Sequence, residues 1–171
     1  MDKRKILNNY FADEDLVRIQ NAVRDIEENI KGELKVTVRI KKPWYRFRET
    51  PENLARNEFI RQKLAYHETP GILIYILLSE KVLFLLFNEY LKKHIPSDEY
   101  TNIADKIQNN FRNGYFTNGI IEAIESFKII LQKYLYTETE ISEPQQTQNK
   151  KNNKKAEASF SKVDFNWLWQ N

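Results

Sequence analysis

Residues 71–87, GILIYILLSEKVLFLLF, are the most apolar part of the chain. Two runs of aliphatic and aromatic residues lie on either side of the polar break Ser79-Glu80-Lys81. A membrane-spanning helix needs about 20 apolar residues, and this break would place two charges in its middle. Short apolar runs around a polar turn are instead typical of two strands that are buried on both faces. We therefore predict a buried hairpin with strands at residues 72–78 and 82–87.

Upstream of the hairpin, the hydrophobic pattern predicts a helix, a strand and a second helix. Apolar residues recur at helical spacing over residues 13–30, with Asp13 as the expected N-cap. Residues 34–40 alternate between apolar and polar side chains, which indicates a strand with one buried face. The pair Thr50-Pro51 is a typical cap followed by proline at the first helical position, so a second helix should begin there.

Downstream of the hairpin, two further helices are expected. Ser97 and the acidic residues after it are typical of a helix start, and Asn118 is the expected cap of the last helix. The predicted order along the chain is therefore α-β-α-β-β-α-α. Because the hairpin strands are apolar on both faces and the helices are amphipathic, we predict an α/β fold. Its architecture should be an α/β/α sandwich, in which helices cover both faces of a mixed sheet with a central hairpin.

Composition excludes several kinds of site. The 171 residues contain no Cys, which excludes a disulfide scaffold, a Cys-liganded metal centre and thiol catalysis. Only His67 and His94 are present, and no nucleophile spacing accompanies them, so we expect surface histidines. A net charge of +3 is too small to indicate a nucleic-acid binder by itself. The basic start has no apolar run of a secretion signal behind it, so we expect a cytoplasmic protein without a transmembrane segment.

The composition changes sharply after Tyr136. Residues 137–159 are rich in Gln, Asn, Lys and Glu, so we predict a flexible polar linker after a domain formed by residues 1–136. Residues 160–171 then form an aromatic terminal segment, which we interpret as a docking peptide. Its candidate partner-binding residues are Phe160, Phe165, Trp167, Leu168 and Trp169. A protein partner is the preferred interpretation, and docking on its own domain or contact with a membrane surface are the alternatives.

Residues 39–48 interleave five cations with three aromatic side chains. Such a mixture can stack bases and pair with phosphates, or lie on an anionic membrane surface. No nucleic-acid-binding motif surrounds it, so a nucleic-acid partner is not expected. We predict that the segment leaves a strand as a loop whose Trp44 and Phe47 pack on the domain, with a protein-partner site as the alternative.

The order of elements and several local signatures resemble the TPM-domain family. The matching pieces are YFADEDLVRIQNAVRDIEENIKGELKV (residues 10–36), the hairpin, and IADKIQNNFRNGYFTNGIIEAIES (residues 103–126). The resemblance covers about residues 9–135 and is greatest to the small soluble bacterial members. It implies helices around a mixed sheet. Some members of the family are reported as acid phosphatases or bind divalent cations, whereas others resemble assembly or scaffold modules.

The resemblance also implies a ligand groove at strand ends, built from carboxylates and glycines. Glu33 matches the family's Gly-Glu position, but Pro70 replaces the usual Asn before the hairpin and Asn88 replaces the usual Asp after it. The loss of a carboxylate weakens a site for a hard cation. Glu33, Asn88 and Glu89 remain as candidate metal ligands, for Ca²⁺ or Mg²⁺ held weakly, and no other cofactor is expected.

Two functions follow from these observations. We expect a non-catalytic, TPM-like binding or scaffold module that acts through protein–protein contacts, with the aromatic terminal segment as its docking element. The alternative is a divalent-cation-dependent, phosphatase-like hydrolase that uses Glu33 and the Asn88–Glu89 loop. The degenerate groove favours the binding module, and the sequence names no catalytic residue.

Overall fold

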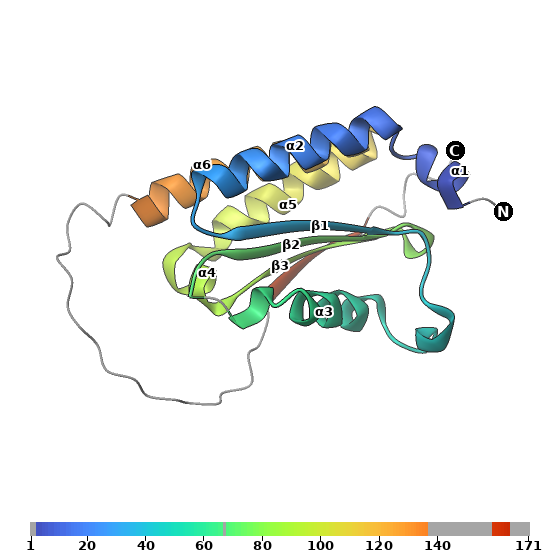
Figure 1. Cartoon of the computed structure of the whole chain (residues 1–171), viewed down its shortest axis with the longest axis horizontal. Helices are drawn as coiled ribbons and strands as arrows, with labels where there is room; N and C mark the ends of the chain where they lie inside the picture. The colour runs from blue at the N-terminus through green and yellow to red at the C-terminus, as the bar shows by residue number, and fades with distance from the viewer. Residues whose placement is uncertain (1–2, 67, 137–158, 165–171) are drawn as a thin grey trace.

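The computed structural model describes residues 3–66, 68–136 and 159–164. Its centre is a four-stranded mixed sheet in the order β1-β2-β3-β4 (Figure 1). The parallel neighbours are β1 and β2, whereas β2–β3 and β3–β4 are antiparallel. The strands are β1 (Glu33–Arg39), β2 (Gly71–Leu77), β3 (Val82–Phe87) and β4 (Ser159–Asp164).

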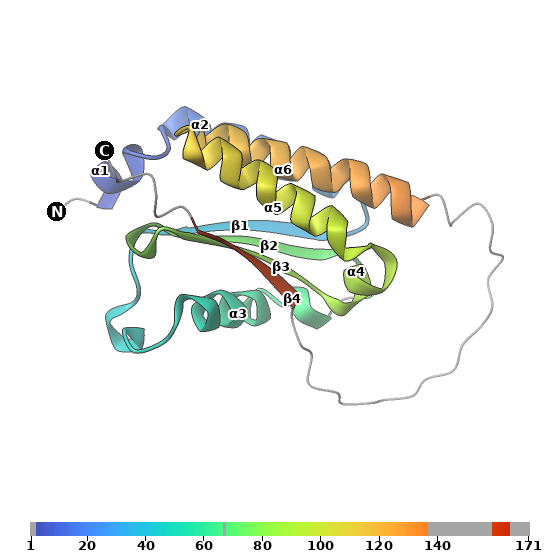
Figure 2. The same ribbon diagram turned by 180° about the vertical axis from the view of Figure 1, so that it is seen from behind.

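Helices cover both faces of this sheet (Figures 1 and 2). On one face lie α2 (Asp13–Asn29), α5 (Ser97–Arg112) and α6 (Phe116–Leu131), and on the other lies α3 (Pro51–Arg61). The predicted α/β/α sandwich is therefore confirmed. The other helical elements of the described residues are short: α1 (Lys3–Asn8), η1 (Trp44–Arg46), η2 (Leu64–Tyr66), η3 (Leu78–Glu80), α4 (Glu89–His94) and η4 (Gln132–Tyr136).

The predicted hairpin is confirmed, with β2 shifted by one residue. Every residue of β2 and β3 is buried. Because successive side chains of a strand point to opposite faces, Ile74 and its alternate neighbours join the core under α2, α5 and α6. Tyr75 and its alternate neighbours join a second, smaller core under α3. The short 3₁₀ turn η3 connects the two strands, and Lys81 closes it in the left-handed region with φ 52°.

One of the predicted helix caps is confirmed and two are wrong. Thr50 Oγ1 accepts a hydrogen bond from the Asn53 amide at 3.2 Å, as expected. The N-cap residue of α2 is Ala12 instead of Asp13. The backbone amide of Ala12 donates a hydrogen bond to the Asp15 carboxylate at 3.1 Å, so an acid in the first turn of the helix satisfies this amide. Helix α6 begins at Phe116, so Asn118 lies in its first turn.

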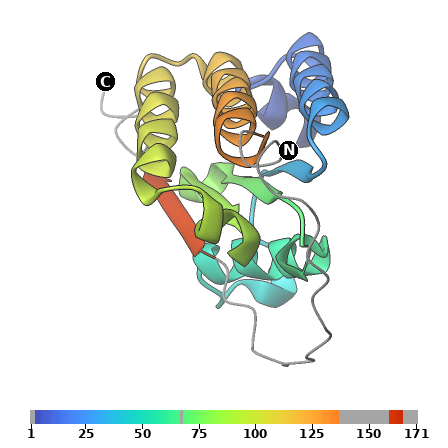
Figure 3. The same ribbon diagram turned by 90° about the vertical axis from the view of Figure 1, so that its left-hand side faces the viewer.

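The terminal segment is described only in part. Residues 159–164 form β4, which pairs with β3 at the edge of the sheet and lies beside α5 (Figure 3). The rest of the predicted linker, residues 137–158, and the candidate docking residues Phe165, Trp167, Leu168 and Trp169 lie outside the described residues. Within the part of the chain that is described, no helix has the length and apolar character needed to cross a bilayer.

Candidate functional site

The three candidate metal ligands lie at one end of the sheet. Glu33 begins β1 and is the register partner of Gly71, the first residue of β2. Asn88 follows the last residue of β3, and its backbone amide donates a hydrogen bond to the Gly71 carbonyl at 3.2 Å. Glu89 is the first residue of α4. The strand ends therefore bring the three candidate residues to one end of the sheet.

The Asn88 side chain is buried and forms hydrogen bonds with the main chain on both sides of it in the sequence. Its Nδ2 donates to the Thr69 carbonyl at 2.7 Å, and its Oδ1 accepts the Leu91 amide at 3.2 Å, which caps α4. Only glycine fits beside it, since a Cβ at Gly71 would lie 2.5 Å from the Leu64 carbonyl oxygen and 3.0 Å from Asn88 Nδ2. An aspartate at position 88 could not donate to the Thr69 carbonyl. These contacts give the departure from the family pattern a structural reason.

The carboxylates at this end of the sheet are drawn into ion pairs with lysines. Glu89 Oε1 lies 2.6 Å from Lys92 Nζ, and Glu33 Oε2 lies 3.9 Å from Lys35 Nζ. Glu99 turns toward the end of α6, where Lys133 Nζ and the Tyr134 hydroxyl lie 3.0 Å and 2.9 Å from it. Hydrogen bonds from Lys133 and Tyr134 lower the pKa of Glu99. Among the described residues, no group of three acidic or histidine side chains could hold a metal ion, and weak cation binding stays a prediction.

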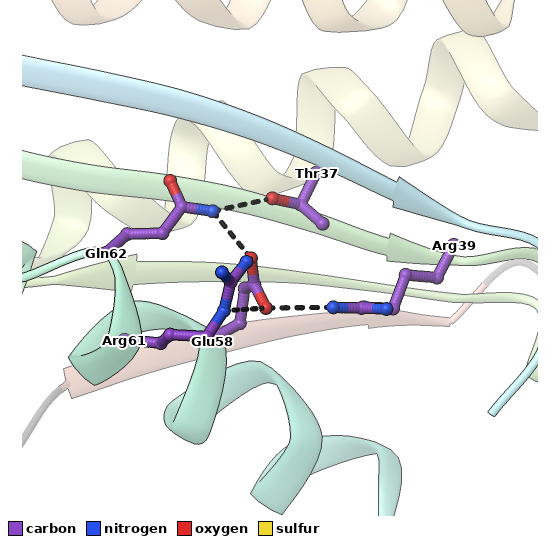
Figure 4. A network of polar contacts seen from close by, with 5 residues as sticks. All are labelled: Thr37, Arg39, Glu58, Arg61 and Gln62. Atoms are coloured by element: carbon purple, nitrogen blue, oxygen red, sulfur yellow. Dashed lines mark hydrogen bonds and ion pairs between the residues drawn. The ribbon is translucent and has the colours of Figure 1, made fainter. Parts of the chain in front are cut away.

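A buried polar network on the other face of the sheet was not predicted from the sequence (Figure 4). Glu58 of α3 is only 5% exposed, and its carboxylate accepts hydrogen bonds from three side chains. Arg39 Nη2, at the end of β1, lies 3.0 Å from Oε2. Arg61 donates to both carboxylate oxygens, and Gln62 Nε2 donates to Oε1 at 2.7 Å and to Thr37 Oγ1 at 3.0 Å.

These contacts keep Glu58 ionised. Burial by itself raises the pKa of this carboxyl, but hydrogen bonds from Arg61, Gln62 and Arg39, together with the charge of Arg61, lower the pKa to about 2. The sequence carried a signal of this site, because Glu58 occupies a core-facing position three and four residues after the buried Ala55 and Leu54. An apolar pattern alone predicts the helix, but it does not show which partner an acid at this position would have.

A cavity of about 290 Å³ adjoins this network. Its walls come from the end of β1, the η1 turn, α3 and the middle of β2. Three arginines, a single acidic residue and two tyrosines are among its lining residues: Arg39, Pro43, Tyr45, Arg46, Leu54, Asn57, Glu58, Arg61 and Tyr75. The cavity therefore has a strongly polar, largely cationic wall on the α3 face of the sheet.

In the basic and aromatic segment beside this cavity, Trp44 and Phe47 do not pack on the domain, so that prediction is wrong. Trp44 is 85% exposed and Phe47 is 64% exposed. The segment projects as a loop between β1 and α3 (Figure 1). The rings of Trp44 and Tyr45 meet edge to face at 5.9 Å, and the Arg48 guanidinium lies 5.3 Å from the centre of the Phe47 ring. The short η1 turn holds these aromatic rings away from both cores.

Comparison with known proteins agrees with this architecture. The TPM domain family matches residues 7–128, which is most of the chain, and the chain belongs to this family. Among solved structures it is similar to the BA42 protein of the psychrophilic bacterium Bizionia argentinensis, determined by NMR. The two share 24% sequence identity over 73% of this chain and 83% of that chain, with a TM-score of 0.64, which shows a common fold. A search of curated proteins found no match.

Proposed function

We propose that this chain is a non-catalytic binding module of the TPM domain family, and that the β3 edge of its sheet is a receptor for an extended peptide. The observation that carries the proposal is the pairing of β4 with β3. All six residues of β3 have register partners in β4, from Val82 opposite Asp164 to Phe87 opposite Ser159. In this mode of recognition the main-chain hydrogen bonds provide affinity, and the side chains provide specificity.

The resident peptide is the start of the aromatic terminal segment. It is joined to the domain through residues 137–158, so it stays near its own β3 edge at a millimolar-order effective concentration. A partner that offers a competing strand would displace it and release the whole terminal segment for docking. The peptide and the β3 edge are thus two binding elements that contact each other within one chain and become available when a partner separates them.

The contacts at the strand ends support binding over hydrolysis. A hydrolase that depends on a divalent cation needs several oxygen ligands aimed at one point. Here the neutral Asn88 side chain bonds to the Thr69 carbonyl and the Leu91 amide, and Glu89 bonds to Lys92. Turnover of a generic aryl phosphate from acid to neutral pH, with and without Mg²⁺ or Ca²⁺, should therefore stay at the uncatalysed rate. Activity that is lost on Glu33→Ala would favour the hydrolase instead.

Amide hydrogen exchange tests the receptor edge directly. The full chain should protect the β3 amides that face β4, and a chain that ends at Tyr136 should lose this protection while β1 and β2 keep theirs. A synthetic peptide of residues 157–171, added to the shortened chain, should restore it. Equal protection in the two chains would contradict the proposal.

A further inference from the structure

We propose that the cavity lined by Arg39, Arg46, Arg61 and Tyr75, here called the arginine pocket, binds the oxyanion group of a small ligand, either a phosphate or a carboxylate. It lies on the α3 face of the sheet, where Tyr75 belongs to the smaller core. The lining of the arginine pocket includes neither the candidate metal ligands at the strand ends nor any residue of β3. The inference is therefore independent of the proposed function.

The first argument is the convergence of three guanidinium groups from three separate elements. Arg39 comes from the end of β1, Arg46 from η1 and Arg61 from the last turn of α3. Glu58 is the single acidic residue in the lining, and Glu49, outside it, accepts a hydrogen bond from Arg46 Nε at 2.6 Å. Positive charge therefore exceeds negative charge around the pocket.

Glu58 positions two of these arginines without using all their donors. A guanidinium carries five N–H donors in a fixed planar arrangement. Arg39 gives one nitrogen to Glu58, and Arg61 gives two nitrogens to it. Fixed guanidinium groups with further donors are the groups that bind phosphate and carboxylate oxygens in bidentate geometry.

The second, independent argument is the hydroxyl of Tyr75. Tyr75 is one of the lining residues, and its hydroxyl is fully buried and has no hydrogen-bond partner among the described residues. Buried polar groups are nearly always hydrogen-bonded, so the unsatisfied hydroxyl of a lining residue is a candidate donor to a ligand. Burial raises the pKa of Tyr75 to about 12, with the charge of Arg39 opposing the rise, so the hydroxyl keeps its proton and can donate to an anion.

The size of the pocket and the residue at its edge indicate the kind of ligand. A cavity of about 290 Å³ lies at the lower end of the range for small-molecule sites, so a small ligand fits it better than a polymer. Tyr45 also lines the pocket, and its ring is exposed. An aromatic body attached to the oxyanion could contact this ring. Aryl phosphates and aryl carboxylates are therefore suitable probes.

Calorimetric titration of the full chain tests the proposal with three probes: phenyl phosphate, benzoate and neutral benzyl alcohol. At least one of the two anions should bind saturably, with a dissociation constant of about 1 mM or tighter, while benzyl alcohol should not. Phenyl phosphate binding more tightly than benzoate would identify a phosphate site, and the reverse order would identify a carboxylate site. If neither anion binds more tightly than benzyl alcohol, the proposal is wrong.

Two variants connect binding to the pocket, each with a matched control. Tyr75→Phe removes only the buried hydroxyl, and Arg46→Gln removes one cation; each should weaken binding about fivefold or more. Tyr100→Phe is the control for the first, since the Tyr100 hydroxyl is the other buried hydroxyl without a partner among the described residues, and it lies in α5. Arg18→Gln in α2 is the control for the second.

The proposal holds if both pocket variants weaken binding about fivefold or more while the controls stay within about twofold of the original chain. Circular dichroism checks that each variant is folded. Tyr75→Phe keeps the ring and should fold. If Arg46→Gln does not fold, the binding result for Tyr75→Phe decides the test by itself. Any other pattern, including equal losses in Tyr75→Phe and Tyr100→Phe, overturns the proposal.

Discussion

Replacing Glu58 by glutamine should destabilise the domain, because the change removes the one charge that holds Arg39 and Arg61 together. The pKa of the Glu58 carboxyl falls from 4.5 to about 2 in the folded chain. At about 1.4 kcal/mol for each pKa unit, the shift corresponds to roughly 3 kcal/mol if the carboxylate were fully shielded from solvent. The side chains of Arg39 and Arg61 are 37% and 68% exposed, so solvent screening reduces the effect. We expect Glu58→Gln to lower the free energy of unfolding at pH 7 by about 1–2 kcal/mol.

The pH dependence of this loss has a definite sign. Because the folded-state pKa of Glu58 is lower than the unfolded value, the carboxylate stabilises the domain fully above about pH 4.5. That contribution is lost as the pH falls from 4.5 toward 2, where the folded state also takes up the proton. The difference in unfolding free energy between the original chain and Glu58→Gln should therefore shrink as the pH is lowered through this window.

Urea unfolding followed by circular dichroism at pH 7, 4.5 and 3 measures both effects. Glu52→Gln is the matched control, because Glu52 lies on the same helix, has a side chain that is 43% exposed, and pairs with Arg56 at 3.2 Å. This exposed ion pair should contribute less than about 0.5 kcal/mol. The reasoning is refuted if Glu58→Gln costs no more than Glu52→Gln, or if its cost does not change between pH 7 and pH 3.

Three further predictions concern the strand-end groove. Asn88→Asp should lower the free energy of unfolding by about 1–3 kcal/mol in urea titrations, because a carboxylate cannot donate to the Thr69 carbonyl; unchanged stability would contradict this. Gly71→Ala should cost a similar amount in the same assay, since its Cβ would lie 2.5 Å from the Leu64 carbonyl oxygen, and a neutral effect would show that the backbone yields easily. Calorimetry should find Ca²⁺ and Mg²⁺ binding weaker than micromolar; micromolar affinity would restore the hydrolase alternative.

The sequence predicts best where one strong local pattern leaves a single structural solution. Residues 71–87 have apolar side chains on both faces of both strands, so only a hairpin covered on two sides can bury them. The family resemblance implies a groove at strand ends, and Glu33 and Asn88 both lie beside Gly71 at one end of the sheet. The use of the Asn88 side chain was not predictable, because its partner at Thr69 is a main-chain carbonyl whose position depends on the chain path before β2.

Features that depend on contacts between distant segments were missed. Glu58 meets Arg39 only after α3 packs against the sheet, so the sequence shows an acid in an apolar stripe without showing its partner. Trp44 and Phe47 were expected to pack because they are large and apolar, but η1 holds them away from both cores. The sequence predicts that residues 159–164 are the end of the linker and the start of the docking peptide. They form β4 because they pair with the edge of β3, which is distant in the sequence.

Fluorescence anisotropy with a labelled peptide of residues 157–171 tests the receptor edge most directly. The peptide is titrated with the chain that ends at Tyr136 and, separately, with the full chain. The shortened chain should bind it saturably, whereas the full chain should bind about a hundredfold more weakly, if the peptide has an affinity of about 10 µM and its tethered copy an effective concentration of about 1 mM. Equal affinity for the two chains, or no binding to either, would contradict the claim that β3 is a peptide receptor filled by the chain's own terminal segment.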